Sequence, residues 1–122
     1  MLSQKFSRKI IKENSNFDLR HDQILELPSQ LFSPFRLIIL SALWREGELE
    51  FKQLLEDIPT ISEGNLSSHI RSLENMGIID VIKEFEGKKP RTSYKLNKKG
   101  VKQILEIVTK LKKTFSDIEE EA

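Results

Sequence analysis

Two short helical patterns separated by only a few residues, within residues 52–77, constrain the fold of this chain most strongly. The first pattern, residues 52–57, is closed by Pro59, because a proline disfavours helical geometry in the residue before it. The second pattern begins after Ser62, a favourable N-cap residue, and ends before Gly77, a residue type common just past helix C-termini. Two short helices joined by a tight turn predict a helix-turn-helix unit.

The second of these helices, residues 62–76, has one apolar side and one unusual polar side. Leu66, Ile70 and Leu73 follow helical spacing, which predicts a buried stripe. The opposite side carries small or polar residues with a single charge: Gly64, Asn65, Ser67, Ser68, Arg71, Ser72 and Asn75. A solvent-exposed helix face normally carries Glu and Lys in pairs about four residues apart. We therefore expect this polar face to contact another macromolecule.

The residues after this helix predict a β-hairpin with a basic connection. Residues 78–85 and 92–96 are rich in β-branched and aromatic side chains, which favour strands, and the sequence EGKKPR between them predicts the loop. A hairpin with a basic tip directly after a helix-turn-helix unit indicates a winged helix. The predicted fold class is α+β: mostly helical, with one small antiparallel β-hairpin.

Upstream of the helix-turn-helix unit, residues 34–46 predict a central core helix. Ser33 can cap its N-terminus, Pro34 suits its first turn, and Gly47 ends it. Its apolar face consists of Leu37, Ile38, Leu40, Ala42, Leu43 and Trp44. Residues 49–51 predict a very short strand that follows this helix.

Both ends of the chain predict amphipathic helices. Leu2, Phe6 and Ile10 recur at helical spacing among basic residues. From the cap residue Asn97 onward, apolar residues recur in steps of three and four: Val101, Ile104, Val108, Leu111, Phe115 and Ile118. The first turns of this heptad seam suit the domain core, but its length favours contact with a second subunit. We expect an unstructured acidic end and a homodimer with contacts from Leu2, Phe6, Ile10, Val108, Leu111, Phe115 and Ile118.

Composition limits the possible functions. The chain has 122 residues and a net charge of +1, but residues 62–102 hold nine Lys and Arg against five Asp and Glu. The absence of Cys, of a Gly-rich phosphate loop and of metal-ligand spacing leads us to expect no enzymatic activity, cofactor or metal. The sequence also has no apolar run of membrane-spanning length and no secretory signal, so we expect a soluble, cytoplasmic protein.

Three stretches carry a family resemblance: SPFRLIILSAL, GNLSSHIRSLENMGII and KEFEGKKPRTSYKLNKKG. Together, from about Ser33 to Gly100, they resemble small archaeal and bacterial winged-helix transcriptional regulators of the MarR and ArsR groups, especially those with a proline-arginine-threonine wing signature. The resemblance implies a homodimer that binds double-stranded DNA through a winged helix-turn-helix, with helices from both chain ends forming the dimer. Metal sensing of the ArsR type is not expected, because the chain lacks Cys and has only His21 and His69.

In such a protein, small polar side chains would let the second helix approach base edges in the major groove. Residues near its N-terminus usually read the bases, which favours Asn65, Ser67, Ser68 and Arg71. Expected contacts to the DNA backbone or from the wing are Thr60, Ser62, Lys88, Lys89, Arg91, Thr92, Lys98 and Lys99. Glu63 is unfavourable beside phosphates unless it turns away or accepts from a cytosine amine. His69 lies at the edge of the buried stripe, where a structural role is favoured over a phosphate contact.

Alternative functions differ in what they require of these surfaces. A winged helix can also serve as a protein-interaction module that does not bind DNA, and RNA binding is a third, weaker option. An unidentified small-molecule effector could bind near Trp44 or Phe115, although both are more simply core residues.

The predicted organisation is a helical arm at residues 1–28, a DNA-binding domain at 29–100, and a C-terminal dimerisation helix with an acidic tail at 101–122.

Overall fold

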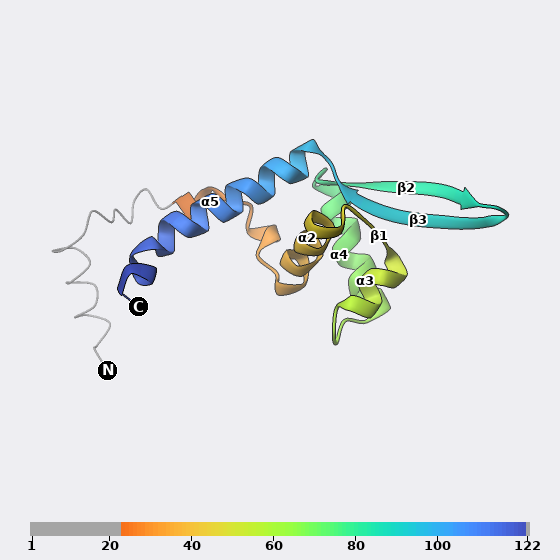
Figure 1. Ribbon diagram of the computed structural model, residues 1–122, viewed down its shortest axis with the longest axis horizontal. Coiled ribbons are helices and arrows are strands. Elements are labelled where there is room, and N and C mark those ends of the chain that lie inside the picture. The colour runs from red at the N-terminus through yellow and green to blue at the C-terminus, as the bar shows by residue number, and fades with distance from the viewer. Residues whose placement is uncertain (1–22, 122) are drawn as a thin grey trace.

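The computed structural model describes residues 23–121 and confirms an α+β winged helix (Figure 1). The elements, in chain order, are the 3-10 helices η2 (Gln23–Glu26) and η3 (Ser29–Leu31), helix α2 (Pro34–Glu46), strand β1 (Glu48–Glu50), helices α3 (Phe51–Asp57) and α4 (Glu63–Asn75), strands β2 (Ile79–Glu86) and β3 (Lys89–Leu96), and helix α5 (Lys98–Glu121). The N-terminal dimer contacts predicted from Leu2, Phe6 and Ile10 lie outside the described residues.

The helix-turn-helix unit forms as its cap residues predict. At the start of α3 the side chain of Gln53 accepts a hydrogen bond from the backbone N–H of Glu50, at 2.8 Å, within a capping box. The Ser62 hydroxyl accepts from the backbone N–H of Asn65 at 3.1 Å and caps α4. Gly77 has a φ of 75° just after α4, a conformation that glycine adopts without a Cβ penalty. These local contacts fix both ends of α4.

The three strands form an antiparallel sheet in the order β1-β3-β2. The prediction that EGKKPR forms a six-residue loop is wrong. Strands β2 and β3 remain paired as far as Glu86 and Lys89, so only Gly87 and Lys88 connect them. Gly87 has a φ of 67°, which suits the tight two-residue turns that match strand twist. Pro90 fits in β3 because β1 pairs with β3 only as far as Ser93, beyond which β3 has a single neighbour.

The hydrophobic core lies where α2, α3, α4, the sheet and the first turns of α5 meet (Figure 1). Its fully buried side chains are Leu31, Ile39, Leu43, Leu54, Leu66, Leu73 and Ile78. The expectation that Trp44 is a core residue is wrong, because its side chain is 47% exposed. Ile38 is 45% exposed as well, whereas Ile39, which the predicted apolar face omitted, is fully buried. Helix α2 therefore packs on the core with a narrower face than its apolar composition indicates.

Helix α5 begins at a crowded junction with the sheet. The Asn97 side chain accepts from the backbone N–H of Gly100 at 2.9 Å, which confirms Asn97 as the cap residue. Gly100 is buried against Ile78, and a Cβ at this position would overlap the Ile78 carbonyl oxygen. Only a glycine lets the start of α5 pack this closely against the backbone at Ile78.

The rest of α5 projects from the body and lies beside η2 (Figure 1). The ammonium group of Lys110 forms an ion pair with the carboxylate of Glu26 at 3.1 Å and joins the two elements. The acidic end was expected to be unstructured, but α5 continues to Glu121, because glutamate favours helix and no breaker interrupts the run. Within the described part of the chain, no helix is both long enough and apolar enough to cross a membrane.

Candidate nucleic-acid interface

Helix α4 presents the small polar face that its sequence predicts. Leu66, Ile70 and Leu73 are buried, as the apolar stripe requires. The exposed residues of the other side are Glu63, Gly64, Asn65, Ser67, Ser68, Arg71, Glu74 and Asn75. Arg71 forms no ion pair with any side chain that the structure describes, so its charge is available to a ligand. All four residues predicted to read bases are therefore exposed on one helix.

His69 anchors α4 to the start of α2. The Nε of Arg36 donates a hydrogen bond to His69 Nδ1 at 3.0 Å, and Arg36 Nη1 donates to the Gln30 carbonyl at 2.7 Å. The rings of His69 and Phe35 lie 5.7 Å apart between centroids. Burial and then the positive charge of Arg36 lower the pKa of His69, so the neutral imidazole is favoured. The structural role expected for His69 is confirmed.

The hairpin of β2 and β3 extends beyond the domain body and carries two lysines at its end (Figure 1). Lys88 lies in the turn and Lys89 begins β3, and both side chains are exposed. The position of these charges on a protruding arm agrees with the basic wing that the sequence predicts.

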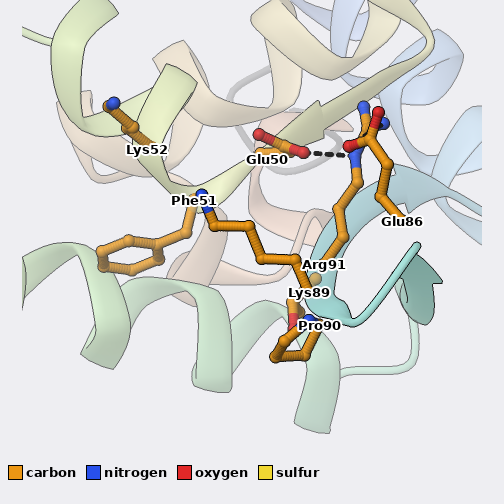
Figure 2. Close-up of a pocket in the computed structure, with 8 residues that line it drawn as sticks. Glu50, Phe51, Lys52, Glu86, Lys89, Pro90 and Arg91 are labelled. Carbon is orange, nitrogen blue, oxygen red and sulfur yellow. Dashed lines mark ion pairs between the residues drawn. The ribbon is translucent and has the colours of Figure 1, made fainter.

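Arg91 lies two residues farther from the hairpin tip than Lys89, and its side chain is already engaged in ion pairs. Its guanidinium forms an ion pair with Glu50 at the start of α3, and a second, longer pair with Glu86 at 3.7 Å (Figure 2). These residues line a cavity between β1, α3 and the hairpin, together with Phe51, Lys52, Lys89, Pro90 and Thr92. Nε and Nη1 of Arg91 are directed at these carboxylates while the side chain stays 47% exposed, so in the predicted wing contact with DNA the guanidinium would be shared with them.

Of the other residues predicted to contact the DNA backbone, some already use their polar groups in hydrogen bonds within the protein and others do not. Lys98 is exposed, but the ammonium group of Lys99 donates to the Met76 carbonyl at 3.0 Å and so satisfies the C-terminal end of α4. The Ser62 hydroxyl is engaged as the α4 cap. Thr60, in the turn before α4, is exposed and has a φ of 67°, a conformation that is rare for a β-branched residue. Thr92 is partly buried on β3.

A groove between α4 and the hairpin contains two residues, Lys83 and Tyr94, that were not among the contacts predicted from the sequence. The groove is lined by Ser67, Ile70, Arg71, Glu74, Val81, Lys83, Thr92 and Tyr94. Burial and the negative charge of Glu74 raise the pKa of Tyr94. The strand period of two places Lys83 and Val81 on one face, and this signal would have identified the groove if the orientation of the hairpin had been known.

Metal ligands are not gathered at this interface. Among the side chains that the structure describes, no group of three or more His, Asp and Glu is arranged to hold a metal ion. His21, the second histidine of the chain, lies outside the described residues.

Comparisons with solved structures give the same fold. A transcriptional regulator homologue from Pyrococcus horikoshii OT3 is 26% identical, with a TM-score of 0.69, over 79% of this chain and 94% of that one. A MarR-family regulator from Enterococcus faecalis V583 is 20% identical, with a TM-score of 0.65, over 90% of this chain and 99% of that one. The reduced form of the regulator YodB from Bacillus subtilis is 21% identical, with a TM-score of 0.59, over 96% of this chain and 93% of that one.

The sequence also matches a described protein family. No curated protein matches the chain significantly. The family model of the winged helix DNA-binding domain matches residues 35–115, which span α2 through most of α5 and include every element of the interface described above. Because this match covers well over half of the chain and the fold agrees with it, the protein belongs to the family of winged helix DNA-binding domains.

Proposed function

We propose that this protein is a transcriptional regulator that binds specific double-stranded DNA sequences as a homodimer. The observation that carries the proposal is the exposed face of α4, which is small and polar over the N-terminal half and lies on the same domain as a basic hairpin tip. Small polar side chains permit close approach to base edges, while lysines at a protruding tip can neutralise phosphates.

In the proposed complex, residues 62–76 lie in the major groove and residues 83–96 contact the adjacent minor groove or the backbone. Asn65 and Arg71 have the side chains best suited to bidentate contacts, Asn with adenine and Arg with guanine. Ser67 and Ser68 can bond either bases or phosphates. Lys88 and Lys89 add phosphate contacts from the wing, and Lys98 adds one from the start of α5.

The dimer is supported by the exposed apolar side chains of α5. Ile104, Ile107 and Leu111 face the core, so Leu111, which the sequence assigned to the dimer, is in part a core contact. The exposed apolar side chains of the helix are Val101, Leu105, Val108, Phe115 and Ile118. Apart from Ile118, these residues share one side of a helix that projects from the body, and apolar rows of this length favour burial against another chain.

A protein-interaction module is the alternative function. Docking surfaces for proteins usually present aromatic or aliphatic anchors. In the described part of the chain, the exposed face of α4 has none, whereas α2 and α5 do. The α4 face therefore favours DNA, and any protein docking is expected on α2 or α5.

A binding titration tests the proposal. The purified protein is titrated against the duplex from upstream of its own gene and against a scrambled duplex, at several salt concentrations. We expect a sequence-dependent complex with a steep salt slope, and two half-sites about 34 Å apart. Failure to bind either duplex would favour the protein-interaction module.

Two variants then separate base reading from backbone contacts. Arg71→Ala is expected to reduce specific affinity by about 1–3 kcal/mol and non-specific affinity by less, because it removes a base contact. Lys88→Ala is expected to weaken binding to both duplexes and to lower the salt slope by about one unit. Equal losses on both duplexes for Arg71→Ala would assign Arg71 to the backbone instead.

A further inference from the structure

We propose that the groove between α4 and the hairpin binds one phosphate of the DNA backbone, with Lys83 as its main cation. Thr92 supplies a hydroxyl donor from the same wall, and Arg71 adds positive charge from the helix wall. This inference rests on the proposed function, and it assigns a role to Lys83, which neither the sequence motifs nor the wing signature selects.

The groove has two walls that carry these groups. On α4, Ser67, Arg71 and Glu74 are three or four residues apart and therefore share one side of the helix. On the hairpin, Lys83 pairs directly with Thr92 across the two strands. Side chains of such a pair lie on the same face with Cβ atoms about 5 Å apart, so the lysine and the hydroxyl can reach one ligand atom.

The charges are distributed unevenly along the groove. Val81 pairs with Tyr94 one step closer to the base of the hairpin than Lys83 and Thr92 do. Glu74 lines the same groove and lies nearer than Arg71 to the C-terminal end of α4, where the hairpin begins, so the acidic residue is on the side of this inner pair. The inner end is thus acidic and partly apolar, while the outer end holds Arg71 and Lys83. An anion is favoured only at the outer end.

Neither outer cation has an ion-pair partner among the side chains that the structure describes. The ion pairs between those side chains involve Arg91 and Lys110, and neither Arg71 nor Lys83 takes part in one. Uncompensated cations facing one groove raise its affinity for an anion, and a charge-assisted hydrogen bond to phosphate is among the stronger polar contacts.

The path of the DNA explains why the anion is a backbone phosphate. If α4 occupies the major groove and the hairpin tip the adjacent minor groove, the sugar-phosphate strand that separates these two grooves must cross between α4 and the hairpin. Figure 1 shows that α4 and the hairpin diverge from the C-terminal end of α4. The groove that contains Lys83 and Thr92 is lined by residues of both elements, as a site for the crossing strand requires.

The first test compares Lys83→Gln with Lys95→Gln. Lys95 is a matched control, because it is also an exposed lysine of the same hairpin but does not line the groove. On a random-sequence duplex, we expect Lys83→Gln to lower the slope of log Kobs against log salt by about one unit. Lys95→Gln should leave it close to the wild-type value, and Lys83→Arg should restore it. Thermal unfolding of each variant checks that the fold is intact.

A second test locates the phosphate. Single methylphosphonate substitutions, placed one at a time along a duplex recovered by selection from a random library, remove one backbone charge each. We expect one position that weakens wild-type binding but has no effect on Lys83→Gln. If wild type binds DNA and Lys83→Gln matches Lys95→Gln in both tests, this inference is overturned and the proposed function stands. If wild type binds no DNA, both are overturned.

Discussion

Among single residues, Arg91 carries a positive charge of the wing that is partly compensated by carboxylates of the same protein. It belongs to the proline-arginine-threonine segment, yet it is paired with Glu50 and Glu86. Its partner Glu50 comes from β1, 41 residues earlier in the chain. The arginine can be placed in the wing from the sequence, but its partners cannot, because Glu50 reaches it through the pairing of β1 with β3 and Glu86 through the exact register of β2 with β3.

Removal of one of these carboxylates should strengthen DNA binding. Glu86→Gln is expected to raise affinity for a random-sequence duplex about threefold at low salt, because it removes a negative charge beside the wing and loosens Arg91. The gain should shrink at high salt, since exposed charges are screened. Fluorescence anisotropy measures both affinities. Glu46→Gln, the same charge change at the end of α2, is the control, and an equal gain there would rule out a local effect.

His69 should make the stability of the fold depend on pH. The pKa of His69 in the folded protein lies below its ordinary value of 6.5, because of burial and Arg36. The unfolded chain therefore binds a proton first as pH falls, so the stabilisation is complete above pH 6.5 and is lost as pH falls through the folded pKa. Denaturant unfolding from pH 7.5 to 5.5 should show this decline.

His69→Gln isolates the contribution of this histidine. Glutamine can still accept a hydrogen bond from Arg36 but does not titrate, so its free energy of unfolding should change less over the same pH range. His21 is present in both proteins and cancels in the comparison. Identical pH profiles for the two proteins would contradict the prediction.

Among the elements, the junction of β3 and α5 depends on one glycine. Gly100→Ala is expected to lower the free energy of unfolding by about 1–3 kcal/mol, because the new methyl group would overlap the Ile78 carbonyl oxygen and force α5 away from the sheet. Urea unfolding followed by circular dichroism measures the loss.

Gly64→Ala, on helix α4, is expected to stabilise the protein, in contrast to Gly100→Ala. Gly64 lies in the first turn of α4, and a Cβ there would have no neighbour within 4 Å. Alanine is therefore expected to raise the free energy of unfolding by roughly 0.5–1 kcal/mol through its higher helix propensity. A loss of stability in Gly64→Ala, or none in Gly100→Ala, would refute this account of the two sites.

In the hairpin, residue type predicted which segments form strands but not where the strands end. The β-branched and aromatic residues identified both strands, but the basic EGKKPR sequence suggested a six-residue loop. Pairing across the strands extends to Glu86 and Lys89 because each added pair satisfies backbone groups that a loop would leave to solvent. Strand ends are thus decided by the partner strand as much as by residue type.

At the scale of the whole molecule, the proposed dimer depends on the exposed side of α5. The double substitution Val108→Asp with Phe115→Asp should yield a monomer, because it places two carboxylates in the proposed interface and leaves the core contacts of Leu111 intact. Sedimentation velocity measures the oligomeric state. Thr109→Asp, an exposed position off the apolar row, is the control and should not alter assembly. A double variant that sediments like wild type would remove the argument for this interface.

The sequence by itself determined the local structure and the chemistry of the surfaces. Cap residues such as Ser62 and Asn97, the apolar stripe of α4 and its polar face all depend on neighbours within a few residues, so they can be read from spacing alone. The same signals were sufficient to identify the winged helix.

Only the tertiary structure decided which apolar residues form the core and which remain exposed. Helices α2 and α5 both carry more apolar residues than one neighbour can cover, and the fold buries Ile39 and Ile107 while it leaves Trp44 and Phe115 about half exposed. It also placed Lys83 in the same groove as Arg71 and paired Arg91 with Glu50. These outcomes depend on contacts between residues far apart in the chain, whose orientation is set by how whole elements pack and not by any local pattern.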